Sequence, residues 1–221
     1  MKKIIFLIVI LISTISFAQR VRGFATIATY LDRELYASGY AKVGFGAEYK
    51  INQIIRPEIE TSFYFGALND FENSNSQNQL VDNLKRYFTS FTMSLCPKIC
   101  IGDKENETNV GFLQILPRYS ISKITSKGSL LTINQTDFTK STKETETFSE
   151  IRHSLGIGIG IYVNLSEKTN DALALNLYYD GIDFGNSLTN LKFTQGKYTT
   201  KNVLGLGINY YFGFVKKKTK I

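Results

Sequence analysis

The chain has little of the residue chemistry that disulfides and metal sites need. Its 221 residues include two cysteines, one histidine, three prolines and no tryptophan. Cys96 and Cys100 fall in one predicted strand, where their Cα atoms would be about 13 Å apart, well beyond the roughly 4.4–6.8 Å that a disulfide tolerates. With a single histidine in the chain, they also fall short of a metal site. We therefore expect no disulfide between them, no metal site and no cofactor.

Long apolar runs are also scarce, except at the start of the chain. Ile4 to Ile12 form an unbroken apolar run, which is shorter than the roughly 20 residues that a membrane-spanning helix needs. Lys2 and Lys3 precede this run, and the small residues of Ser16-Phe17-Ala18 follow it. This arrangement is typical of a cleavable secretory signal peptide, so any membrane residence of the mature chain must come from strands.

The predicted organisation is therefore a signal peptide over residues 1–18 and one domain over residues 19–221. Removing Lys2 and Lys3 lowers the formal net charge from +7 to +5 (7 − 2). This excess is too small to indicate a nucleic-acid partner. The only dense block of like charge, Lys216 to Lys218 with Lys220, is interpreted as a solvated tail.

Alternation of apolar and polar residues dominates the rest of the chain and predicts strands rather than helices. Eight such segments are separated by turn-rich polar stretches, and most reach the 9–11 residues with which a tilted strand crosses a bilayer. We predict strands at about 22–31, 40–51, 54–66, 86–101, 110–123, 150–165, 171–184 and 200–214.

The predicted connections alternate in length. Those after the second, fourth and sixth strands are brief, whereas the others are mostly longer. The connections at 67–85 and 124–149 carry polar stretches at 69–83 and 132–149, which we expect to be mobile and exposed. Short turns on one side and long loops on the other are typical of outer-membrane barrels of Gram-negative bacteria. The fold prediction is an all-β, eight-stranded antiparallel transmembrane β-barrel with up-and-down topology, its short turns in the periplasm and its loops outside.

The alternation also predicts which side chains face lipid. In the sixth strand Ile157, Ile159 and Ile161 share one parity, and Gly156, Gly158 and Gly160 share the other. Applied to the other strands, this parity sends charges of both signs inward, where we expect a structural ion-pair network and little conductance. The predicted interior network comprises Lys42, Glu48, Lys50, Arg56, Glu58, Glu60, Lys98, Arg118 and Asp180.

A soluble ligand-binding barrel would show the same periodicity, with its apolar face turned inward. The signal peptide, the strand lengths, the aromatic residues near strand ends and the unequal loops favour the membrane barrel.

Two motifs invite a functional reading. The glycines at 156, 158 and 160 recur at every second residue and no helix pattern follows, so they do not form a nucleotide-binding loop. His153 adjoins Ser154, but neighbouring residues on a strand point to opposite faces and cannot form a nucleophile–base pair. We therefore expect no catalytic residue.

The chain resembles the small OmpA/OmpX-like barrels, and more closely the compact outer-membrane barrel family that includes PorT-like proteins. The resemblance rests on Ser16-Phe17-Ala18-Gln19, on Ile55-Arg56-Pro57-Glu58-Ile59-Glu60, on Leu95-Cys96-Pro97-Lys98 and on the closing run from Gly205 to Phe212. It implies recognition by the barrel-assembly machinery through a terminal aromatic residue, here Phe212 or Phe214, although this chain continues to Ile221.

These observations lead to one main functional hypothesis and three alternatives. The main hypothesis is a non-enzymatic outer-membrane barrel with a structural role, or one that contacts a surface or envelope protein through its long loops. The alternatives are a PorT-like secretion or assembly accessory, an enzyme that modifies outer-membrane lipid with His153 and a hydroxyl from a neighbouring strand, and a soluble secreted ligand-binding barrel. Outer-membrane lipid is the one partner that the main hypothesis requires.

Overall fold

The computed structural model describes residues 21–32, 35–102, 111–165, 171–194, 196–201 and 203–212. The predicted signal peptide, most of two predicted turns and the lysine-rich tail with Phe214 lie outside these residues. No helix in the described part of the chain is long and apolar enough to cross a membrane.

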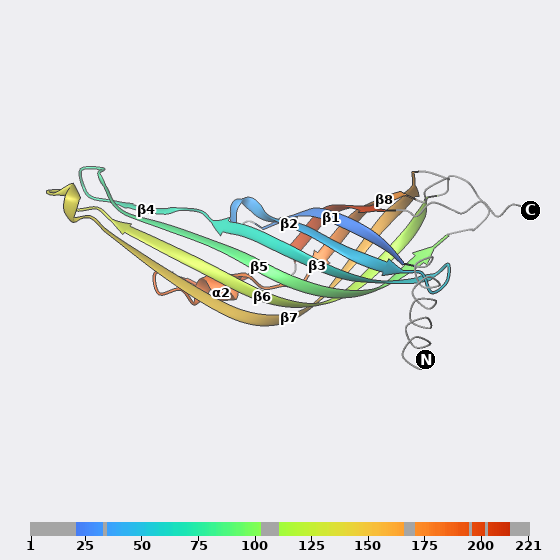
Figure 1. The fold of residues 1–221 in the computed structure, drawn as a ribbon. Coiled ribbons are helices and arrows are strands. Elements are labelled where there is room, and N and C mark those ends of the chain that lie inside the picture. The colour runs from blue at the N-terminus through green and yellow to red at the C-terminus, as the bar shows by residue number, and fades with distance from the viewer. Residues whose placement is uncertain are drawn as a thin grey trace, which may run out of the picture.

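The described residues form nine strands and two short helices (Figure 1). The elements are β1 (Val21–Leu31), β2 (Leu35–Tyr49), β3 (Ile55–Leu68), β4 (Phe71–Ser74), β5 (Leu80–Ile101), β6 (Phe112–Thr132), η1 (Phe138–Lys140), β7 (Thr142–Asn164), β8 (Ala172–Asp180), α2 (Gly185–Thr189) and β9 (Val203–Tyr211).

Eight of the strands close into a ring. Every neighbouring pair is antiparallel, β9 pairs with β1, and β3 pairs with β5, which leaves β4 outside the ring. The predicted eight-stranded antiparallel barrel is therefore confirmed. The register pairs Val21 with Tyr49 and Phe24 with Tyr211, so β1 begins where β2 and β9 end. We call this the turn end of the barrel.

The interior is narrow enough to require glycine beside its largest rings. Tyr178 of β8 lies between β7 and β9, and a Cβ atom added at Gly158 or Gly207 would lie 2.8 or 2.7 Å from its ring. Both distances are too short for ordinary packing. The alternate glycines therefore face the interior, as their parity predicts, and leave room for its large rings.

The predicted strand bounds were wrong where strands continue past the barrel. The fourth, fifth and sixth predicted strands extend by 6, 9 and 8 residues as β5, β6 and β7, because each finds a hydrogen-bonding partner in the extended neighbour. The second strand already begins at Leu35, so the connection before it is short. The seventh strand ends at Asp180, four residues before its predicted end.

These extra residues form a four-stranded sheet that projects from the barrel, which we call the extension: β4 with residues 80–86 of β5, 124–132 of β6 and 142–150 of β7 (Figure 1). The prediction of loops at 67–85 and 124–149 was wrong, because Thr-rich and β-branched residues there pair in register up to Thr132 and Thr142. Pairing between β7 and β8 covers only Ile157 to Asn164, so β7 forms one edge of the extension.

The connection from β8 to β9 packs back into the mouth of the barrel. Phe184 stacks on Phe88 with ring centroids 4.4 Å apart and meets Tyr40 edge-on at 5.1 Å. Ser187 of α2 hydrogen-bonds to Ser126 of β6 at 2.5 Å between their hydroxyl oxygens. An aromatic cluster therefore fills the extension end of the interior.

Candidate functional site

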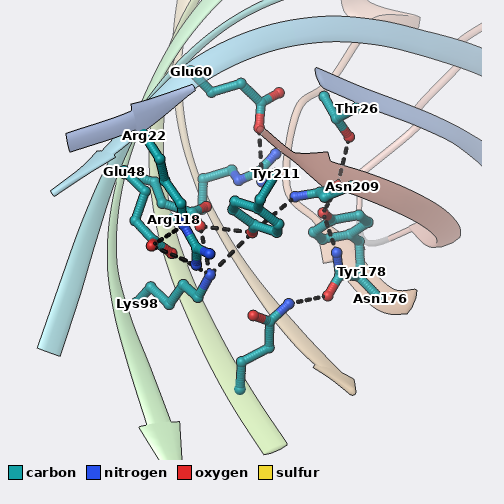
Figure 2. Close-up of polar contacts among 12 residues, drawn as sticks. Arg22, Thr26, Glu48, Glu60, Lys98, Arg118, Asn176, Tyr178, Asn209 and Tyr211 are labelled. Carbon is teal, nitrogen blue, oxygen red and sulfur yellow. Dashed lines mark hydrogen bonds and ion pairs between the residues drawn. The ribbon is translucent and has the colours of Figure 1, made fainter. Parts of the chain in front are cut away.

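A network of paired charges lies inside the barrel near the turn end (Figure 2). Its centre is Lys98 of β5, whose Nζ donates to Glu48 of β2 at 2.5 Å and to Glu58 of β3 at 2.9 Å. The hydroxyl of Tyr211 accepts from Lys98 at 3.0 Å and donates to Glu58 at 2.7 Å. One ammonium group therefore joins four strands of the ring.

Arg22 completes this network, and the sequence analysis missed it. Its Nη2 lies 2.6 Å from Glu48 Oε1, and its guanidinium lies over the rings of Tyr162 and Tyr211 at 5.0 and 4.6 Å. Arg22 has the parity of Phe24, opposite to that of Ile27, which faces outward. Extending the alternation to the first residues of β1 would have placed it inside.

A second group of charges lies farther along the interior. The ammonium of Lys42 pairs with Glu60 at 2.5 Å, and Arg118 of β6 reaches the other oxygen of Glu60 at 3.1 Å. The rings of Tyr64 and Tyr178 lie 5.7 and 5.4 Å from the Lys42 ammonium. These groups are buried, and buried ions persist only when they are paired in this way.

The remaining predicted members lie at the margins of these two groups. Asp180 is buried and accepts a hydrogen bond from the hydroxyl of Tyr64 at 3.2 Å. Arg56 is buried with its guanidinium 5.1 Å from the ring of Phe112. Lys50 follows the last residue of β2 and is half-buried, so its place in the interior network stays a prediction. The strand ends one residue before it.

Uncharged polar side chains link the opposite wall of the interior. Asn209 of β9 accepts from Thr26 of β1 at 2.8 Å and from the Tyr178 hydroxyl at 3.2 Å. Asn176 of β8 accepts from Gln114 of β6 at 2.5 Å (Figure 2). These amides have the inward parity, although the predicted interior network contains only charged residues. With its ions paired and its rings packed, the interior has the chemistry of a structural core.

The outer face of the ring has the opposite character. Ile157, Ile159, Ile161 and their counterparts on the other strands are exposed, whereas the interior holds the ions. Aromatic pairs lie on this face, with Phe63 and Phe91 5.2 Å apart, and Tyr210 and Phe212 5.1 Å apart at the end of β9. A soluble ligand-binding barrel would have the reverse arrangement. This is the polarity of a membrane-spanning barrel.

The other residues considered as candidates, the two cysteines and the pair His153 and Ser154, form no joint site in the fold. Cys96 and Cys100 are both buried and free, which confirms that they do not bridge. His153 is exposed on the outer face, and its Nδ1 lies 2.7 Å from the hydroxyl of Tyr119. Ser154, which has the opposite parity, is half-buried. Among the described residues, no group of His, Cys, Asp and Glu is placed to hold a metal ion.

No protein-family model and no curated protein matches the sequence. Three solved structures illustrate the structural similarity. The attachment invasion locus protein Ail of Yersinia pestis, in complex with a heparin analogue, is 11% identical with a TM-score of 0.39 over 88% of this chain and 97% of that one. Neisserial surface protein A is 14% identical (TM-score 0.37; 88% and 96%), and a major outer membrane protein of Thermus thermophilus is 11% identical (TM-score 0.45; 87% and 99%). These similarities are weak, and the fold assignment depends on the strand pairing described above.

Proposed function

We propose that this chain is a non-enzymatic integral outer-membrane barrel that holds a rigid sheet, the extension, outside the cell. The observation that carries the proposal is the inverted polarity of a closed ring, with aliphatic side chains outside and paired ions inside. In water this arrangement would expose the apolar face and bury the charges for no gain. In a bilayer both placements are favourable.

The extension supplies a surface for a partner protein of the envelope or of another cell. It lies at the end opposite the β2–β3 turn, in which Asn52 accepts hydrogen bonds from the backbone of Ile54 and Ile55 at 2.8 and 2.6 Å. Short turns of this kind face the periplasm in bacterial barrels. The extension therefore faces outward, with Phe138 exposed at its tip.

Epitope insertion tests this orientation. A tag after Thr136, at the tip, is expected to bind antibody on intact cells. The same tag between Asn52 and Gln53 is the matched control and is expected to bind only after permeabilisation. The reverse result would contradict the orientation, and a full-length protein that fractionates as soluble and lacks heat-modifiable gel migration would contradict the barrel itself.

A photoreactive residue tests the partner surface. At Ile159, on the outer face of the ring, it is expected to crosslink to lipid. At Lys143, on the same face of β7 but near the tip of the extension, it is expected to crosslink to protein. Protein adducts at both positions, or lipid adducts at both, would contradict the division of β7 into a membrane part and a partner part.

One observation favours a second candidate, an enzyme that acts on outer-membrane lipid. His153 has a hydroxyl partner on the neighbouring strand, Tyr119, and both face outward where lipid would lie. Among the described residues no carboxylate hydrogen-bonds to His153, and such a group usually orients a catalytic histidine. Altered lipid A masses in a His153→Ala strain would support this candidate, and unchanged masses would remove it.

The PorT resemblance gives a third candidate, a secretion or assembly accessory. Co-purification of the tagged barrel with a defined set of envelope secretion components would support it. Purification of the barrel without them would count against it.

A further inference from the structure

We infer that the outer face of β6, just beyond the apolar band, binds phosphate groups of outer-leaflet lipid through Lys123 and Lys127. This inference rests on the proposed membrane location. It concerns a surface that neither the interior network nor the tip of the extension uses. We call it the lysine face.

The position of the lysine face relative to the apolar band is the first argument. The outward residues of β6 run from Leu113 through Tyr119 to Ile121 and span 9 residues, which is the length that a tilted strand needs to cross the hydrocarbon core. Lys123 is the next outward residue. Its ammonium therefore lies at the level of the lipid headgroups, where lysine side chains turn toward the polar layer.

The neighbours of these lysines are apolar, aromatic or hydroxyl-bearing rather than acidic. Lys123 lies opposite Phe91 and Ile151, and Lys127 lies opposite Tyr87 and Thr147. In the part of the chain that the structure describes, neither lysine forms an ion pair, although both are exposed. Two unneutralised cations are thus set about 13 Å apart on one strand, next to rings that suit the membrane interface.

The absence of acids from the outward residues of β5, β6 and β7 in the extension is the second argument. The inward face carries charges of both signs, and Arg152 pairs there with Glu150 at 2.7 Å. The acidic residues of β7, Glu144, Glu146 and Glu150, share the inward parity, and Glu150 accepts from Asn186 at 3.1 Å. The acids on the lysine side stand apart on the β4 side of the sheet, where Asp70 pairs with Lys85 at 3.3 Å and Glu72 accepts from Asn83 at 3.0 Å. On these three strands the lysine face therefore carries cations and no acid, which suits an anionic ligand.

A lipid phosphate is the anion that agrees with both arguments, because Lys123 and Lys127 lie directly beside the apolar band. A soluble polyanion would be bound equally well by lysines at the tip, away from the band. Each lysine near anionic headgroups strengthens lipid binding about fivefold, so loss of Lys123 and Lys127 together would weaken lipid binding roughly 25-fold.

The experiment compares the full-length barrel, Lys123→Gln/Lys127→Gln and Lys140→Gln/Lys143→Gln, all folded in detergent micelles. The last variant removes the same charge from the far end of the extension and is the matched control. Bis-phosphorylated lipid A and its dephosphorylated form are the two lipid probes, with sucrose octasulfate as the soluble polyanion. Binding is measured by native mass spectrometry.

We expect the Lys123/Lys127 variant to lose affinity for bis-phosphorylated lipid A roughly 25-fold, and the control variant to bind as the unaltered chain does. Dephosphorylated lipid A should bind all three proteins alike. Equal losses in both variants would indicate net charge alone and overturn the inference, as would a loss confined to sucrose octasulfate. Heat-modifiable migration is recorded first: its absence in the unaltered chain contradicts the proposed function, whereas its presence with unchanged lipid A affinity overturns only the lysine face.

Discussion

The ring and the extension are built partly from the same three strands, yet their side chains follow different rules. Within the ring, β7 alternates isoleucine outward with glycine inward, whereas in the extension it alternates lysine and threonine with glutamate. The hydrogen-bonded pairing with β6 continues unchanged through both regions. The backbone pairing is therefore the same on both sides of the boundary between ring and extension, and only the solvent around the side chains changes.

The largest effect is expected from breaking the interior network. Lys98→Ala leaves Glu48 and Glu58 buried without their shared cation, which should lower the free energy of unfolding by about 3–5 kcal/mol. Urea unfolding in detergent measures this loss. Lys143→Ala, in the extension, is the control and should change stability by less than about 0.5 kcal/mol; equal effects would show that the two regions do not differ.

A single arginine substitution at two positions of β7 compares the outer faces directly. Ile159→Arg places a charge near the middle of the apolar band and should cost about 2–4 kcal/mol. Thr147→Arg has the same parity but lies in the extension, where about 0.5 kcal/mol or less is expected. Folding yield into vesicles and unfolding midpoints report both. A tolerated Ile159→Arg would mean that this surface does not meet lipid.

Replacing a glycine with alanine should destabilise the crowded interior of the ring more than the extension. Gly158→Ala brings a Cβ atom to 2.8 Å from the Tyr178 ring, and the resulting strain should cost about 1–3 kcal/mol. At Gly128, in β6 of the extension, the nearest atom is a Leu191 methyl at 3.5 Å, an ordinary contact. Gly128→Ala is therefore expected to be close to neutral in the same unfolding measurement.

The smallest effect concerns Asp137 at the tip. Hydrogen bonds from the hydroxyl and backbone of Thr139, together with Lys140, lower the pKa of this carboxyl below its usual 3.8. Because the carboxylate is the bonded form, local order at the tip is present above the usual pKa and is lost as pH falls through the lowered one. Carboxyl NMR titration should show the pKa rising in Thr139→Ala, and an unchanged value would remove these bonds as the cause.

Much of the ring could be predicted because apolar and polar side chains alternate along each strand with a period of two residues. The alternation identified all eight strands of the ring, the outward isoleucines of β7 and eight of the nine proposed interior charges, whereas the ninth, Lys50, stays a prediction. The same rule would have found Arg22. Its partner, Glu48, lies 26 residues away in the sequence but directly opposite Arg22 on the neighbouring strand β2.

The extension and the aromatic cluster could not be predicted in the same way. The segments at 80–85 and 142–149 are rich in polar residues, which is typical of loops when each segment is read alone. They become strands because each pairs with another. Phe184 similarly lies in a connection, and only the closed barrel offers it Phe88 and Tyr40 as packing partners.

The sequence alone therefore determined the local periodicity, and with it the strands of the ring, the apolar outer parity and the unbridged cysteines, because side-chain direction on a strand depends only on position. The tertiary structure decided which charges meet, how far β5, β6 and β7 run beyond the barrel, and that α2 folds into its mouth. Those outcomes depend on contacts between residues far apart in the chain. Ring closure brings such residues together, and no local pattern records them.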